Sequence, residues 1–200
     1  MKIFNLNADE WDRTEEREGW RFKDAWVGAH TDAELIGASM YEVEPGNKQG
    51  PFHTHHANEE WAIVLRGEPT LRTHEGEQQL RQGDVVAFPR GKEGAHQIRN
   101  DTDAPVRVLM LSTLIAPDIV EYLDTGKIGA RSVAGERIIF ARPGPELEYW
   151  EDEDSLGDNA RSPGPACGKC HPTPRSSGLR KGQPPNRPSR SAERQWGRDR

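Results

Sequence analysis

Apolar and polar residues alternate along most of the segment 22–113. A period of two residues is typical of strands with one buried face, whereas the 3.6-residue period of a helix is scarce in this segment. The alternation predicts short strands at residues 22–27, 35–43, 52–55, 61–66, 69–73, 78–80, 85–88, 96–100 and 106–113. Short strands at such close spacing favour an all-β sandwich or barrel.

Turn signals separate the predicted strands, and most of them contain glycine: Pro45-Gly46, Glu75-Gly76, Gly83-Asp84, Arg90-Gly91 and Asn100-Asp101. Glycine reaches positive φ without steric cost, so we expect Gly67, Gly83 and Gly91 to lie at turns. Helical patterning is limited to two short segments, 8–17 and 116–123. In the second, Pro117 is suited to a first helical turn.

Composition divides the chain at about residue 150. Apolar residues make up only 33% of the sequence, and the last fifty residues contain almost none of them. A segment rich in Pro, Gly, Ser and Arg buries too little apolar surface to offset its ordering entropy. We therefore predict an N-terminal extension packing on the barrel at 1–33, a barrel core at 34–115, a C-terminal addition packing on it at 116–150, and a disordered tail at 151–200.

The net charge of −6 hides an asymmetry, because residues 161–200 carry +8 and the rest of the chain about −14. An acidic body argues against a nucleic-acid partner. No apolar stretch approaches the ~18 residues of a membrane span, so we expect no membrane partner. The two cysteines lie in the tail and supply no disulfide framework, which favours a cytoplasmic location.

Those cysteines form a second motif, Cys167-Gly-Lys-Cys170-His171, which fits the pattern of c-type haem attachment. Haem attachment needs export and a packed pocket, and the polar, proline-rich flanks offer neither. Adventitious zinc binding by the two thiolates and the imidazole is the alternative. We expect neither to define the function of the chain.

Four side chains carry the candidate chemistry. His53 and His55 lie two residues apart, so on a strand both imidazoles project to the same face. Glu60, at the start of the next predicted strand, can return beside them, and His96 begins another strand. Three imidazoles and one carboxylate suit one divalent metal ion. Fe, Mn, Zn and Ni remain open as its identity.

The spacing of these residues resembles the two motifs of the cupin superfamily. His53-Thr-His55, four residues, Glu60, six residues and Gly67 match the first motif, although Gly46 precedes His53 by one residue more than usual. Gly83, five residues, Pro89-Arg-Gly91, His96, three residues and Asn100 match the second motif, with two extra residues before His96. Loop insertions of this size are tolerated.

The resemblance, to small single-domain metal-binding cupins, implies a double-stranded β-helix, or jelly-roll, barrel with a metal held by His53, His55, Glu60 and His96. One alternative is that a shorter turn exchanges the roles of Glu59 and Glu60. We expect His56 to face solvent.

Cupins include dioxygenases, isomerases and non-catalytic sensors, so the fold alone does not name a reaction. We expect a metal-binding protein, either a dioxygenase-like or isomerase-like enzyme acting on a small organic substrate, or a non-catalytic small-molecule binder with a structural metal. A homodimer is expected in both cases. No catalytic base is identifiable. One of Arg66, Arg99 and Arg107 could reach an anionic substrate, although outward-facing charge is the simpler interpretation.

Overall fold

The computed structural model describes residues 1–132, 137–145, 147 and 151. Nearly all regular structure in them is β-sheet, with one α-helix, α1 (Val27–His30), and one 3-10 turn, η1 (Lys92–Gly94). The strands are β1 (Arg13–Glu15), β2 (Phe22–Ala25), β3 (Ile36–Val43), β4 (His53–His55), β5 (Glu60–Arg66), β6 (Thr70–Thr73), β7 (Gly76–Gln79), β8 (Val85–Phe88), β9 (Gln97–Arg99), β10 (Val106–Thr113), β11 (Asp118–Tyr122), β12 (Lys127–Arg131) and β13 (Arg137–Ala141).

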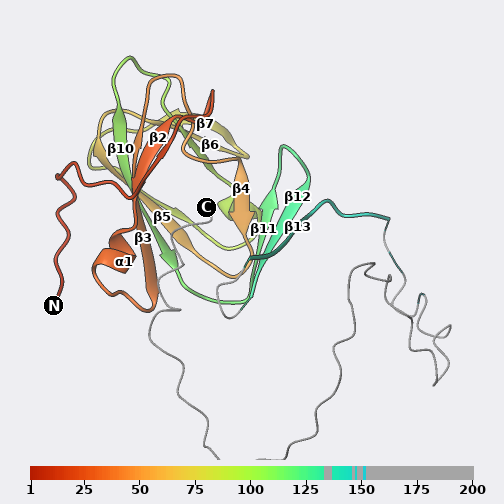
Figure 1. Ribbon diagram of the computed structural model, residues 1–200. Coiled ribbons are helices and arrows are strands. Elements are labelled where there is room, and N and C mark those ends of the chain that lie inside the picture. The colour runs from red at the N-terminus through yellow and green to blue at the C-terminus, as the bar shows by residue number, and fades with distance from the viewer. Residues whose placement is uncertain (133–136, 146, 148–150, 152–200) are drawn as a thin grey trace, which may run out of the picture. The chain divides into compact units, whose positions relative to one another are not determined.

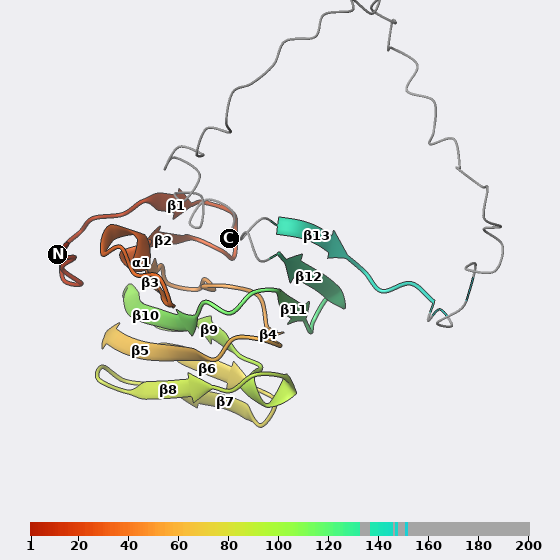
Figure 2. The same ribbon diagram turned by 90° about the horizontal axis from the view of Figure 1, so that it is seen from below.

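The strands form three antiparallel sheets (Figures 1 and 2). The largest has the order β1-β2-β3-β10-β5-β8, and the two smaller ones have the orders β13-β12-β11-β4 and β7-β6-β9. An isolated bridge between His53 and His96 joins the two smaller sheets. They therefore act as one layer opposite the large sheet, which is the double-sheet arrangement of a jelly roll.

The main core lies between these two layers. The inward residues of the large sheet alternate with outward ones, as the period-two pattern requires. They meet the apolar side chains of the smaller layer, which include Leu71 on β6 and Ile98 on β9. The buried members of this core are Phe22, Tyr41, Val43, Ala62, Val64, Leu71, Leu80, Phe88, Ile98, Val106, Val108 and Met110.

The outer face of the large sheet has a second, smaller core. Ala25, Met40 and Leu109 are buried there, and the N-terminal segment covers them with Phe4, Leu6 and Trp11. The large sheet is therefore buried on both faces over part of its area, and the segment before β2 supplies the second cover.

The nine strands predicted from alternation are confirmed, with ends that shift by one or two residues. The two predicted helices are wrong. Residues 116–123 contain β11 instead, because Ile119, Val120 and Tyr122 are strand formers and β11 pairs with both β4 and β12. Residues 8–17 contain β1, which pairs with β2. Tertiary pairing has overridden a weak local helix signal in both segments.

The three glycines predicted to lie at turns all have positive φ, as expected. Gly67, Gly83 and Gly91 have φ values of +81°, +92° and +79°. At Gly67 a Cβ atom would also lie 2.8 Å from a methyl group of Val106, so this turn has no room for a side chain.

No helix in the described part of the chain is long and apolar enough to cross a membrane. The predicted tail, apart from residue 151, and the motif at residues 167–171 lie outside the described residues. The cytoplasmic location and the homodimer stay predictions.

Candidate metal centre

Strand β4 presents His53 and His55 to the same side of the smaller layer. Thr54 between them points the other way, is fully buried, and donates a hydrogen bond from its hydroxyl to the Gly91 carbonyl. β11 pairs with β4 so that Val120 lies opposite His55 and Tyr122 opposite His53. The bridge between His53 and His96 places the third imidazole beside the first.

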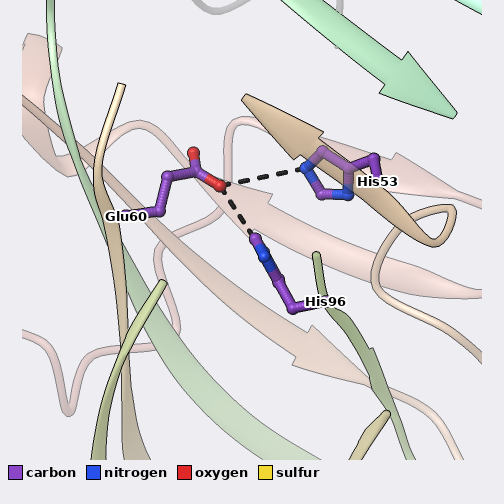
Figure 3. A group of neighbouring side chains, drawn as sticks. All are labelled: His53, Glu60 and His96. Atoms are coloured by element: carbon purple, nitrogen blue, oxygen red, sulfur yellow. Dashed lines mark ion pairs between the residues drawn. The ribbon is translucent and has the colours of Figure 1, made fainter. Parts of the chain in front are cut away.

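Glu60 comes from the facing layer, where the burial of β5 alternates from its first residue. Glu60 lies on the inward face with Ala62 and Val64, whereas Trp61 points outward. The Oε2 atom of Glu60 lies 3.8 Å from Nε2 of His53 and 3.5 Å from Nε2 of His96, as Figure 3 shows. Nε2 of His55 also lies 3.5 Å from this oxygen.

These distances fit one shared ion. Nitrogen and oxygen ligands that lie about 2.0–2.2 Å from a metal are roughly 3–4 Å from one another. His53, Glu60 and His96 each offer one ligand atom, and these atoms lie within 4.8 Å of one another. These three side chains come from three separate regions of the chain. His55 lies outside that group of three and is connected to it by the 3.5 Å contact of its Nε2 with the same Glu60 oxygen.

Glu59 and His56, which are next to proposed ligands in the sequence, both lie outside the cluster. Glu59 is exposed and accepts a hydrogen bond from the indole nitrogen of Trp61, 2.9 Å away. His56 is exposed as expected, with Nε2 2.7 Å from a carboxylate oxygen of Glu121. Neither residue points toward the cluster, because each is one position out of phase with an inward neighbour.

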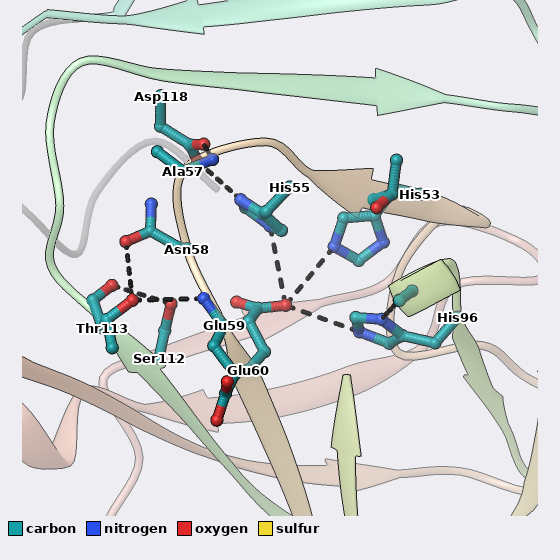
Figure 4. A network of polar contacts seen from close by, with 12 residues as sticks. His53, His55, Ala57, Asn58, Glu59, Glu60, His96, Ser112, Thr113 and Asp118 are labelled. Carbon is teal, nitrogen blue, oxygen red and sulfur yellow. Dashed lines mark hydrogen bonds and ion pairs between the residues drawn. The ribbon is translucent and has the colours of Figure 1, made fainter. Parts of the chain in front are cut away.

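The other nitrogen of each cluster histidine faces a hydrogen-bond acceptor. Figure 4 shows the contact of His55 with Asp118. Nδ1 of His53 lies 2.8 Å from the Pro51 carbonyl, and Nδ1 of His96 lies 2.9 Å from the Gly94 carbonyl. Nδ1 of His55 lies 2.6 Å from a carboxylate oxygen of Asp118. A carbonyl or carboxylate oxygen accepts a hydrogen bond and cannot donate one, so each Nδ1 carries a ring hydrogen.

The pKa shifts agree with neutral rings. Burial and the neighbouring His96 lower the pKa of His53 to about 3, and burial also lowers the pKa of His96. At neutral pH, the close approaches of His53 and His96 to Glu60 are therefore contacts of neutral rings. Nε2 of each of these two rings carries a lone pair that faces the Glu60 carboxylate. Nε2 of His96 is buried and has no hydrogen-bond partner among the described residues.

These atoms favour a cation among them, because imidazole lone pairs that face a buried carboxylate repel it. Three imidazole nitrogens and one carboxylate oxygen are a donor set that binds divalent transition metals. The residues present therefore fit a metal ion.

Asp118 is a functional residue that the sequence analysis missed. It is 3% exposed, and its second carboxylate oxygen accepts a hydrogen bond from the Ala57 amide. Burial raises its pKa, but the hydrogen bond and charge of His55 outweigh that effect, and the pKa is lowered overall. Asp118 lies 63 residues from His55 in sequence, inside the segment predicted as a helix. The alternation of Ile119 and Val120 was the signal that could have placed it on a strand.

The two extra residues before His96 form a local structure of their own. They are accommodated by η1, which follows the positive-φ turn at Gly91. A Cβ atom at Gly94 would lie 1.7 Å from the Pro89 carbonyl oxygen, so this turn closes tightly against the end of β8. The ring of Phe88 stacks on that of His96 with 3.7 Å between centroids. The insertion thus leaves the orientation of His96 intact.

A small cavity opens beside the cluster, between the start of β5, the end of β10 and strands β11 and β12. His55, Glu60 and Asp118 line one side, and Arg131 of β12 lines it as well. The three arginines proposed from the sequence face elsewhere. Arg66 and Arg107 bind Glu42, and Arg99 binds Glu77 and Asp101.

Comparisons with known proteins agree with this geometry. Residues 39–112 match the family model of the cupin domain. A provisionally named sugar phosphate isomerase from Acidithiobacillus ferrooxidans is 26% identical with a TM-score of 0.59, over 65% of this chain and 83% of that one. A sugar phosphate isomerase of the cupin superfamily from Silicibacter pomeroyi is 28% identical with a TM-score of 0.58, over 66% and 82%. No curated protein matches the sequence.

Proposed function

Since the chain contains a cupin-type domain, we propose that it is a metal-dependent enzyme that acts on a small organic substrate through one divalent ion. The proposed ligands are His53, His55, Glu60 and His96. The observation that carries the proposal is the convergence of three Nε2 atoms and one carboxylate oxygen in a buried space.

The roles of the ligands follow from their charge. Glu60 supplies the single negative charge of the set and offsets part of the charge of a divalent ion. The three imidazoles remain neutral, so the site as a whole keeps a net positive charge of about one. When bound, such an ion polarises a substrate oxygen as a Lewis acid or, if redox-active, exchanges electrons with dioxygen and substrate.

Asp118 is a positioning residue in this proposal. Its carboxylate accepts a hydrogen bond from Nδ1–H of His55. This contact favours the tautomer whose lone pair is on Nε2 and orients the ring toward Glu60. Carboxylate–histidine pairs of this kind also raise the basicity of the ligating nitrogen. The backbone carbonyls of Pro51 and Gly94 hold the other two rings in the same way.

An isomerase-like reaction is the version we favour over a dioxygenase-like one. Both relatives described above are named as sugar phosphate isomerases, and they align over most of their own length. A Lewis-acid metal beside a substrate carbonyl or hydroxyl is the chemistry that such a reaction requires. The second candidate is a non-catalytic binder, because no separate base for proton transfer has been identified among the residues that line the cavity.

Elemental analysis of protein purified without chelator tests the metal. We expect about one equivalent of a divalent ion per chain, lost in the His96→Ala variant and retained in His56→Ala, whose imidazole is exposed. Protein that is folded but contains no metal would overturn the proposal. Turnover of sugar phosphates or other hydroxycarbonyl compounds by the loaded protein supports the isomerase-like version. Oxygen uptake supports the dioxygenase-like one, and metal occupancy without turnover supports the binder.

A further inference from the structure

Asn58 is a buried polar residue in the connection between β4 and β5. It lies between two of the proposed metal ligands, His55 and Glu60, and its side chain lines the cavity beside the cluster. A buried amide needs hydrogen-bond partners for its oxygen and for its nitrogen. The groups that Asn58 binds therefore indicate what this residue does for the site.

Both ends of the Asn58 amide bind the end of β10 and the residues that follow it. Oδ1 accepts a hydrogen bond from the Thr113 hydroxyl, 3.0 Å away, as Figure 4 shows, and another from the Ile115 amide, 2.7 Å away. Nδ2 donates to the Ile115 carbonyl at 3.0 Å. Since Ile115 presents both an N–H and a carbonyl, its partner must be an acceptor and a donor at once, which a side-chain amide is.

The segment held in this way carries Asp118, whose carboxylate orients the His55 ring. Asp118 begins β11 three residues after Ile115, and it accepts hydrogen bonds from Nδ1 of His55 and from the Ala57 amide. Burial raises the pKa of this carboxyl, and the His55 ring and the Asn58 amide are among the groups that lower it. Asn58 is therefore linked to Asp118 both along the chain and electrostatically.

The same segment forms one wall of the cavity. Its lining members are Thr113, Leu114, Ile115, Ala116 and Asp118. Because the hydrogen bonds of Asn58 hold Ile115 in the middle of this wall, they also fix the shape of the space onto which His55 and Glu60 open.

We propose that Asn58 is a positioning residue of the metal site, which holds the segment 113–118 against the β4–β5 connection and so keeps Asp118 on Nδ1 of His55. The part of this inference that concerns metal affinity rests on the proposed function. The part that concerns the His55 ring applies to the metal-free protein as well, because the hydrogen bonds of Asn58 and Asp118 do not involve the ion.

Metal affinity of the full chain, measured by competitive chelator titration, tests the proposal in Asn58→Leu. We expect the affinity to fall about 10-fold, as when a residue that supports a metal ligand is replaced. Asn47→Leu is the matched control and should leave the affinity unchanged. Asn47 is 8% exposed against 7% for Asn58, and it likewise accepts from one backbone amide and donates to one carbonyl, those of Arg21 and Pro45.

A double variant separates positioning from a general loss of stability. If Asn58 acts through Asp118, then Asn58→Leu should lower the affinity by only about twofold or less in a chain that already carries Asp118→Asn. The same 10-fold loss in both backgrounds would overturn the proposal, because the two residues would then act independently.

Nitrogen NMR of the metal-free protein at mildly alkaline pH supplies a readout that does not depend on the metal. The wild type should show the Nδ1–H tautomer of His55, and Asn58→Leu should add a population of the Nε2–H tautomer, whereas Asn47→Leu should not. An unchanged tautomer together with unchanged metal affinity in Asn58→Leu would also overturn the proposal. A folded wild type without metal overturns the proposed function instead, and the tautomer then decides the role of Asn58.

Thr113→Val is a milder variant that tests the same link if Asn58→Leu does not fold. It removes the hydroxyl that donates to Asn58 and retains a side chain of similar shape. The loss of one neutral hydrogen bond should lower metal affinity roughly two- to fivefold, with a smaller change of the His55 tautomer in the same direction. Wild-type values of both in a folded Thr113→Val variant would contradict the proposed link.

Discussion

Two buried polar clusters lie on opposite faces of the large sheet. On the inward face, Glu60 of β5 meets three imidazoles. On the outward face, Arg107 of β10 binds Glu42 of β3 and Asp9 of the N-terminal segment, each with 2.7 Å between nitrogen and oxygen. Both clusters are polar and both are built from residues distant in sequence, but their hydrogen-bonding balance differs.

The Arg107 cluster is complete by itself. The guanidinium donates to Glu42, to Asp9 and to the carbonyls of Leu6 and Ala8, and its face packs over the ring of Trp11 at 4.9 Å. In the inward cluster, the imidazole lone pairs of His53 and His96 face the Glu60 carboxylate. The first cluster fastens the N-terminal segment to the sheet, whereas the second has the composition of a site that takes up a cation.

The largest effect is expected at Glu60, the single anionic ligand. Glu60→Gln should abolish stoichiometric metal binding. The affinity should fall by more than the roughly 10- to 100-fold that is typical when a residue that only hydrogen-bonds a metal ligand is replaced. Glu59→Gln, one residue away and exposed, should leave metal content unchanged. Elemental analysis and competitive chelator titration measure both. Loss of metal in Glu59→Gln alone would show that the roles of the two glutamates are exchanged.

Removing Arg107 should lower the free energy of unfolding and leave metal binding unchanged. Arg107→Met leaves Glu42 buried without its main partner, which costs about 3 kcal/mol in the free energy of unfolding. Urea denaturation measures the change, and Arg99→Met, in an exposed ion pair, should cost less than about 1 kcal/mol. If Arg107→Met kept full stability but lost metal, the division between the two clusters would be wrong.

The two clusters should also respond to acid in different pH ranges. In the metal-free protein, the pKa of His53 is lowered to about 3, while the unfolded chain binds a proton near pH 6.5. Protonation therefore favours unfolding, and the free energy of unfolding should fall by about 1.4 kcal/mol per pH unit for this residue as pH drops below 6.5. His96, whose pKa is also lowered, adds in the same direction.

Glu42 acts only in a more acidic range. Burial raises the pKa of Glu42, but the hydrogen bond and charge of Arg107 outweigh that effect, and the pKa is lowered overall. The contribution of Glu42 to the free energy of unfolding is therefore present above pH 4.5 and is lost as the pH falls below that value. Urea titrations of metal-free protein between pH 7.5 and 5 isolate the histidines. A flat profile over that range, or one unchanged by His53→Gln, would contradict neutral imidazoles in the folded site.

The smallest effect is expected at Asp118. Asp118→Asn should lower metal affinity about 10- to 100-fold, because an amide can present its NH₂ group to Nδ1 and no longer stabilises the His55 tautomer electrostatically. Glu121→Gln on the same strand, whose partner His56 is exposed, is the control and should change nothing. Equal metal affinities in the two variants would reduce Asp118 to a structural role.

The strands and ligands that the sequence predicted correctly are those defined by a local pattern of residues. Local alternation predicted the strands from β2 to β10, and the spacing of His53, His55 and Glu60 placed three ligands within eight residues. The segments predicted as helices failed because their strands are defined by pairing: β11 lies between β4 and β12, and no local pattern contains those neighbours.

The sequence by itself determined the strands, because a period of two residues decides which side of a strand each side chain takes, and its resemblance to the two cupin motifs implied the barrel and the four candidate ligands. Only the tertiary structure decided what surrounds them. Asp118 and Arg131 reach the site through the register of β4, β11 and β12, and the three arginines near the motifs turn outward to carboxylates of other strands. Register depends on contacts between distant segments, and these form only when the chain is folded.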